Sequence, residues 1–173
     1  VALLLGGSVA VAGSDSVWQR LRGIHPRAEQ YSVDVPDSRI KAGGARAFVK
    51  APIATTMAVV TDYANYKEMI RRFEQAEVVG KHGDQTDVAV RVPILKGRAR
   101  VKGTLRFDPP RQVGDETVIV GRMIDGNVKR FEATFRLKKV DDANTQLSLE
   151  MLINPSFPAP GSLVTTETAD AAD

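Results

Sequence analysis

Apolar and polar residues alternate with a period of two along most of the chain after residue 77, and this pattern predicts β-strands. Turn-forming residues, such as Gly83-Asp84 and Asp125-Gly126-Asn127, separate the alternating segments. Strands are expected at residues 78–81, 87–92, 98–107, 117–121, 131–137 and 147–153. Because short turns join successive strands, the predicted sheet is antiparallel, with one apolar face and one charged face.

Two further strands are predicted ahead of this series. Residues 45–50 alternate clearly and predict a first strand, whereas residues 31–36 alternate weakly and predict an edge strand that ends at its proline. At the other end of the chain, residues 162–173 contain a helix start, but their apolar content falls to alanines.

Helical spacing appears between the first strand and the long series. Ile53, Met57 and Val60 recur at the interval of one helix face and predict a first helix. Asn65 is expected to cap a second helix over residues 66–73.

This order of elements resembles the START-like (SRPBCC, helix-grip) superfamily, which includes START-type lipid-transfer domains, polyketide cyclase/dehydrase-like proteins and coenzyme Q-binding proteins. The resemblance extends over residues 40–170. It is carried by Ala51-Pro52, Val59-Val60-Thr61-Asp62-Tyr63, Tyr66, the hairpin of residues 78–92, Leu149-Glu150-Met151 and Pro158-Ala159-Pro160.

The resemblance implies an α+β helix-grip fold. In such a fold a curved antiparallel sheet, here of about six to seven strands, follows two short helices after strand one. A C-terminal helix packs across the sheet, and the tunnel between them holds a hydrophobic ligand. The chain departs from the family pattern at its end, where only Leu163 and Val164 are large apolar residues, so the C-terminal helix is expected to be truncated.

The start of the chain is predicted to be a partial signal peptide over residues 1–12, with Ala10-Val11-Ala12 as the cleavage signal. A buried N-terminal strand or helix is the alternative. Residues 13–38 are expected to form an N-terminal extension and residues 39–173 the START-like domain. The predicted location is therefore secreted or periplasmic.

Composition narrows the functional classes. The 173 residues suit one domain, and a hydrophobic content of 43% with 26% charged residues is ordinary for a globular protein. A net charge of +3 gives no reason to expect nucleic acid as a partner. The chain has no cysteine, and His25 and His82 lie far apart, so no cofactor or metal is expected.

The apolar face of the predicted sheet supplies the candidate ligand contacts. Small residues on that face, Gly103 and Ala133, are expected to leave room in its middle. Filling a solid core is the alternative role for every residue of the set, because any half-buried sheet needs alternating apolar residues. The candidates are Val90, Val92, Val101, Leu105, Val118, Val120, Phe131, Phe135, Leu149 and Met151.

The opposite face carries a basic run of Arg91, Arg98, Arg100, Lys102 and Arg106. It is interpreted either as an ordinary solvated surface that discourages edge pairing or as a surface attracted to anionic membranes. In the second interpretation Arg98, Arg100 and Lys102 face the membrane. Aromatic residues are not interleaved with these cations, which argues against single-stranded nucleic acid.

The sequence predicts an exported protein that binds or transfers a lipid, an isoprenoid or a polyketide-like molecule. The alternatives are a cyclase/dehydrase- or hydrolase-like enzyme using the same cavity and a protein-interaction module with a filled core. No catalytic residue is assigned, because Glu132 and Glu150 are expected on the outer face and Asp62-Tyr63 at a helix end. The identity of the ligand and the oligomeric state stay open.

Overall fold

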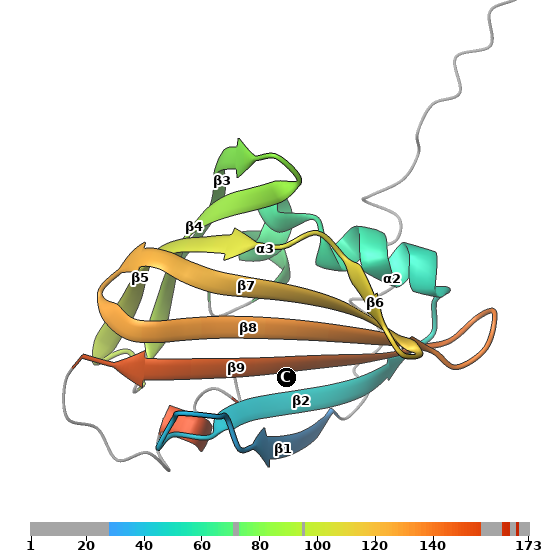
Figure 1. Ribbon diagram of the computed structural model, residues 1–173, viewed down its shortest axis with the longest axis horizontal. Coiled ribbons are helices and arrows are strands. Elements are labelled where there is room, and N and C mark those ends of the chain that lie inside the picture. Colours follow the sequence, from blue (N-terminus) through green and yellow to red (C-terminus); the bar gives the residue numbers. More distant parts are fainter. Residues whose placement is uncertain (1–27, 71–72, 95, 157–163, 167–168, 170–173) are drawn as a thin grey trace, which may run out of the picture.

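The structure of the protein, a computed structural model, describes residues 28–70, 73–94, 96–156, 164–166 and 169. Its main element is a curled nine-stranded sheet in the order β1-β2-β9-β8-β7-β5-β4-β3, with β6 paired to β7 (Figure 1). All neighbouring strands are antiparallel. The strands are β1 (Glu29–Val33), β2 (Ala42–Val49), β3 (Gln75–His82), β4 (Gln85–Ile94), β5 (Ala99–Phe107), β6 (Arg111–Val113), β7 (Glu116–Gly126), β8 (Val128–Lys139) and β9 (Thr145–Pro155).

Short helical segments connect β2 to β3, namely α2 (Ile53–Val60), η1 (Tyr63–Asn65) and α3 (Tyr66–Met69). α2 packs against β8 and β9, whereas η1 and α3 pack against β3. None of the helices in the described part of the chain has the length and apolar content required to span a bilayer.

Near the C-terminus, residues 164–166 are helical and Val164 is buried in the main core. The hydroxyl of Thr165 donates a hydrogen bond of 3.0 Å to the carbonyl of Lys41, just before β2. This contact fixes the helical residues beside the sheet, as the helix-grip arrangement predicts.

The strand register assigns the side chains to two faces. Phe131 lies opposite Ile153 and Phe135 opposite Leu149, and all four side chains point to the concave, core-forming face. The alternate residues, such as Arg136 opposite Ser148, point to the convex face. The expected division into an apolar and a charged face is therefore confirmed.

Several element boundaries differ from expectation. The sheet has nine strands rather than six or seven, partly because β6 is too short to show a pattern. The edge strand β1 begins at Glu29 and pairs with β2, so the sheet starts before the boundary at residue 39. α3 ends at Met69, well short of residue 73, and the Asn65 side chain does not cap it but donates to the Asp62 carboxylate at 2.8 Å. The predicted signal peptide lies outside the described residues.

Close packing in the sheet depends on Gly121 of β7. A Cβ atom at this position would lie 2.5 Å from Cε1 of Phe107, which is itself fully buried. The absence of a side chain on Gly121 therefore creates the space that the Phe107 ring occupies.

We predict that Gly121→Ala lowers the free energy of unfolding by about 1–3 kcal/mol, because the added methyl group must displace a ring that cannot move freely. Urea denaturation followed by circular dichroism measures the change. Gly80→Ala is the matched control, since a Cβ atom there has no neighbour nearer than 4.0 Å. Equal destabilisation by both substitutions would contradict the explanation.

Candidate ligand-binding site

The concave face of the sheet is the candidate site, because apolar side chains of β4, β5, β7, β8 and β9 converge there. Val60, Tyr63 and Tyr66 cover this face from the helical segments, and Val164 contacts the same core. Within the described strands, every inward position of β8 from Phe131 to Leu137 is apolar. A surface of this kind recognises a ligand by its shape and its apolar area.

Burial across the concave face is uneven. Leu105 and Ile119 in its middle are almost completely buried. Leu147 and Leu149 of β9 are only half-buried, as is the neighbouring Ala47 of β2. The region around Ala47, Leu147 and Leu149 is therefore one part of the face where apolar side chains keep some accessible surface.

Most of the predicted ligand contacts do come together on this face. Their placement follows from the pairing of Val92 with Val101 and of Phe135 with Leu149. Contact with a ligand stays a prediction for each of them. The residues so placed are Val90, Val92, Val101, Leu105, Phe131, Phe135, Leu149 and Met151.

Val118 and Val120 lie on the other face, so the expectation for these two residues is wrong. Val118 is opposite Arg136 and Val120 opposite Thr134, whereas Ile119 is opposite Phe135. Three consecutive apolar residues give no alternation by which to choose a face.

Ile119 is therefore the inward residue that the sequence interpretation missed. The flanking positions contain the signal that identifies it. Glu116 and Arg122 share the alternation of Val118 and Val120, and charged residues favour the solvent-facing side.

Gly103 does not leave the room that its small size suggests. A Cβ atom there would lie 2.7 Å from Cε of Met123 and 2.3 Å from the carbonyl oxygen of Asp125. Met123 and the adjoining backbone thus fill the space beside Gly103.

An aromatic cluster closes the face toward the helical segments. Tyr63 stacks on Phe107, with the ring centroids 4.4 Å apart, and Tyr66 meets Phe107 and Phe135 edge to face. The Tyr66 hydroxyl donates to the carbonyl of Val60, so its polar atom is satisfied inside the core. Burial raises the pKa of Tyr66 well above its ordinary value. Asp62-Tyr63 is thus part of the packing of the helical segments.

Outside this cluster lies a groove of about 430 Å³ between η1, the β3–β4 hairpin and the turn after β5. Tyr63 and Phe107 form part of its wall, and Asp62, Asp84 and Asp108 are among its polar lining residues. Burial, and then the charge of Asp108, raise the pKa of Tyr63 to about 12, so its hydroxyl stays protonated at neutral pH. Sequence reasoning missed this groove, because β3, η1 and the turn after β5 are distant in the chain.

A sequence model of the family described as polyketide cyclase / dehydrase and lipid transport matches residues 49–166, which is more than half of the chain. The chain belongs to this family. The match covers α2 and all strands from β3 to β9, and it agrees with the helix-grip order of elements. No curated protein sequence matches the chain.

Solved structures agree with the family assignment at the level of the fold. A START superfamily protein from Mycobacterium smegmatis superposes with a TM-score of 0.62 at 17% identity, over 73% of this chain and 86% of that chain. A STAR-related lipid transfer protein from Xanthomonas axonopodis gives 0.65 at 13% identity, over 84% and 90%. The Zhui aromatase/cyclase from Streptomyces sp. R1128 gives 0.55 at 17% identity, over 77% and 82%.

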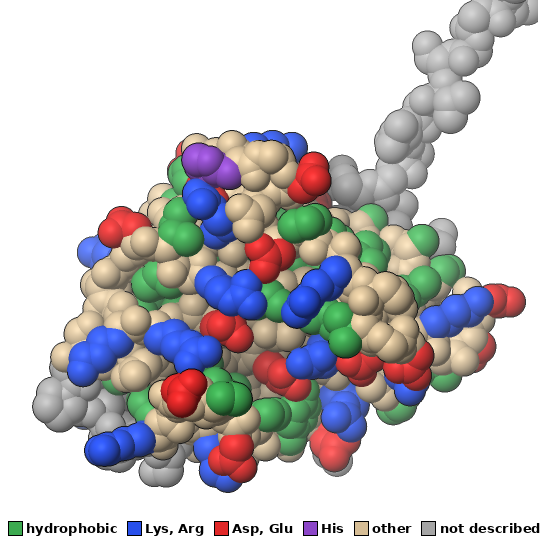
Figure 2. Space-filling model, viewed as in Figure 1, with side chains coloured by type: hydrophobic (Ala, Val, Ile, Leu, Met, Phe, Trp, Pro, Cys, Tyr) green, Lys and Arg blue, Asp and Glu red, His purple; other side chains and the backbone are tan. Residues whose placement is uncertain are grey.

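In this member of the polyketide cyclase / dehydrase and lipid transport family, the convex face carries an array of ion pairs (Figure 2). Arg106 and Asp87 are joined by hydrogen bonds of 2.7 and 2.8 Å, and Arg122 donates to Asp108 at 2.7 Å. Hydrogen bonding to Arg106 is the main cause that lowers the pKa of Asp87, and partial burial opposes it.

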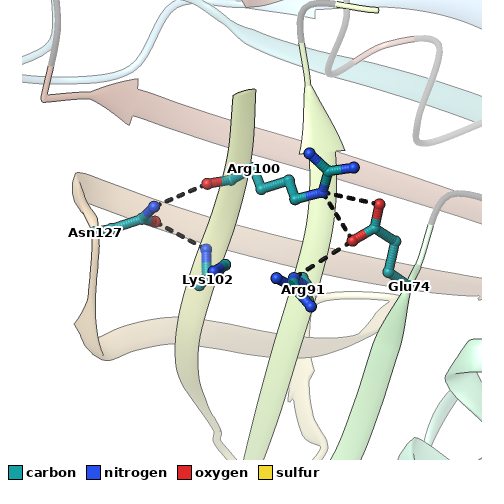
Figure 3. Close-up of polar contacts among 5 residues, drawn as sticks. All are labelled: Glu74, Arg91, Arg100, Lys102 and Asn127. Atoms are coloured by element: carbon teal, nitrogen blue, oxygen red, sulfur yellow. Dashed lines mark hydrogen bonds and ion pairs between the residues drawn. The ribbon is translucent and has the colours of Figure 1, made fainter. Parts of the chain in front are cut away.

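The predicted basic run is consequently not a row of free cations. Glu74 binds Nε of Arg100 with both carboxylate oxygens at 3.0 Å, and the same carboxylate lies 3.4 Å from Nε of Arg91 (Figure 3). Arg106 is paired with Asp87. Arg98 and Lys102 form no ion pair with any described residue, so these two keep their charge available.

Asp108 is held as a carboxylate at the edge of the groove. Partial burial raises the pKa of Asp108, but hydrogen bonds from Gln85 and Arg122 outweigh it, so the net pKa lies below the ordinary value. A carboxyl group with a lowered pKa stabilises the folded state above its unfolded pKa. That contribution disappears as the pH falls through the folded value.

We predict that Asp108→Asn lowers the free energy of unfolding by about 1 kcal/mol at neutral pH, because two charge-assisted hydrogen bonds are weakened. The difference from the wild type should shrink as the pH falls below the ordinary pKa of an aspartate, about 4, because the unfolded carboxyl group protonates there and the folded one only at lower pH. Urea denaturation over this pH range measures it.

Asp84→Asn is the matched control, since Asp84 lines the same groove but forms no hydrogen bond or ion pair with the described residues. It should leave stability almost unchanged. A stability difference for Asp108→Asn that does not depend on pH would refute the assignment to the carboxylate.

Proposed function

We propose that the protein binds a hydrophobic small molecule, such as a lipid, an isoprenoid or a polyketide-like compound, on the concave face of its sheet. The observation that supports this proposal is an apolar concave face that keeps half-buried side chains at Ala47, Leu147 and Leu149. Burying apolar ligand surface there contributes about 25 cal/mol per Å² before the costs of binding.

The chemistry of the inward residues favours binding over catalysis. Acid–base catalysis needs a positioned proton donor or acceptor beside the substrate. Among the described strand residues of the central concave face, the inward positions of β8 and β9 carry hydrocarbon or thioether side chains. The buried hydroxyl groups of Tyr66 and Thr145 already donate to the carbonyls of Val60 and Ala51.

The packed middle of the sheet indicates where the ligand lies. Met123 and Phe107 occupy the spaces beside Gly103 and Gly121, so a ligand placed there would have to displace buried side chains. Leu147 and Leu149 instead offer apolar area that is not yet covered. We therefore place the ligand along β9, between the sheet and the helical residues that contain Val164.

The names of structural neighbours support the same class of function, because one is a STAR-related lipid transfer protein and another an aromatase/cyclase. An enzyme that uses this cavity, and an interaction module with a filled core, are the alternatives. Export of the protein, expected from residues 1–12, belongs to the same proposal. Determining the N-terminal sequence of the protein recovered from its host tests whether these residues are removed.

We predict that Leu149→Glu raises the dissociation constant of a fluorescent fatty acid by more than about tenfold, because the introduced carboxylate on the concave face must lose water when the fatty acid binds. Displacement titrations with the full-length chain measure the effect. A milder variant, Leu149→Thr, should show a smaller loss and guards against a failure of the glutamate variant to fold.

Gln146→Glu is the matched control, because residue 146 is half-buried on the convex side of the same strand. It adds the same charge and should leave displacement unchanged. Absence of any fatty-acid or sterol binding by the wild type, with mass spectrometry showing no co-purified hydrophobic compound, would rule out the proposed function.

A further inference from the structure

Exposed cations gather at one end of the sheet, opposite the end that carries α2. The turn between β4 and β5 contributes Lys96 and Arg98, and the adjoining part of β5 contributes Lys102. The end of β7 adds the exposed side chain of Ile124, which is 49% accessible, and the start of β8 adds Lys129. We call these five residues the basic tip.

Asn127 joins the two hairpins into one surface. Its side-chain oxygen accepts a hydrogen bond of 2.8 Å from the backbone N–H of Lys102, and its side-chain amide donates one of 2.8 Å to the carbonyl of Arg100 (Figure 3). Its own backbone N–H donates to the carbonyl of Lys102 at 3.0 Å. The hydroxyl of Ser156, just after β9, donates to the Asn127 carbonyl at 3.1 Å. These hydrogen bonds hold the strands that carry the cations in fixed positions relative to one another.

Most of the charge at this end is not neutralised. Glu74 is engaged with Arg91 and Arg100. Asp125 is the acidic residue on the β7–β8 side of the tip. Within the described part of the chain, Lys96, Arg98, Lys102 and Lys129 form no ion pair, so four cations face one nearby unpaired carboxylate.

We propose that the basic tip docks the protein onto an anionic lipid bilayer. Each cation near a negatively charged bilayer surface strengthens partitioning about fivefold, and Ile124 supplies an apolar group that can enter the interface. The turns bring no aromatic residue beside these cations, which makes single-stranded nucleic acid a poorer fit.

The tip lies at the far end of the strand that contains the proposed ligand contacts. β9 runs from the α2 end of the sheet to the basic tip. Leu147 and Leu149 lie in the half of this strand nearer α2, and its C-terminal end lies beside Asn127. Docking places this end of the concave face next to the bilayer. The docking itself does not depend on the identity of the ligand.

The experiment is sedimentation of the full chain with phosphatidylcholine vesicles that contain or lack phosphatidylglycerol. We expect binding only to the anionic vesicles, and weaker binding as salt is added. The double variant Arg98→Gln/Lys102→Gln should lose about thirtyfold in partitioning, the product of two cations. Ile124→Ser should weaken the binding that remains at high salt.

Lys50→Gln/Lys139→Gln is the control, because it removes the same charge at the opposite end of the sheet. It should bind like the wild type, since charges farther than about 10 Å from the surface are screened at 0.1 M salt. Both double variants should bind the fluorescent fatty acid as tightly as the wild type does. This result separates docking onto the bilayer from the proposed ligand binding. Equal loss in both, equal binding to neutral vesicles, or tighter binding to a single-stranded oligonucleotide would overturn the proposal.

Discussion

The register between β8 and β9 is the constraint on which the rest of the structure depends. It places Phe131, Phe135 and Leu137 opposite Ile153, Leu149 and Leu147 on the concave face. The same register places Arg136 beside Glu150 on the convex face, with 3.6 Å between Nε and Oε2. A slip of one residue would expose the aromatic side chains and bury the ion pairs, and both changes are unfavourable. One pairing therefore creates the apolar surface and the charged surface together.

The alternation of apolar and polar residues that sets this register can also be read from the sequence. β8 alternates throughout and β9 alternates as far as Met151, so their inward residues were predicted correctly from the pattern. β7 has Val118, Ile119 and Val120 in a row, and there the local pattern could not choose a face. Gly103 and Gly121 show a second limit of prediction from sequence. A small residue can either leave an empty space or make room for the side chain of a neighbouring residue. Only the cross-strand positions of Met123 and Phe107 decide between the two.

These filled positions change what the concave face can accept. With its middle packed, the concave face keeps a short strip of partly accessible apolar area at Ala47, Leu147 and Leu149. The groove beside Tyr63 and Phe107 is separated from this strip by the stacked rings, so it is a distinct polar-edged surface.

The net charge describes the electrostatics of this protein poorly, because the arrangement of the ion pairs matters more than the sum of the charges. The value of +3 hides a convex face in which arginines alternate with carboxylates and an end of the sheet in which lysines do not. Paired arginines on the face contribute little long-range field, since each is offset by a carboxylate within 4 Å. The cations of the basic tip have no such partner in the described chain, so their field extends outward from one end. The proposed orientation on an anionic surface thus rests on where the described chain has no carboxylate beside a cation, even though basic residues are spread over much of the sheet.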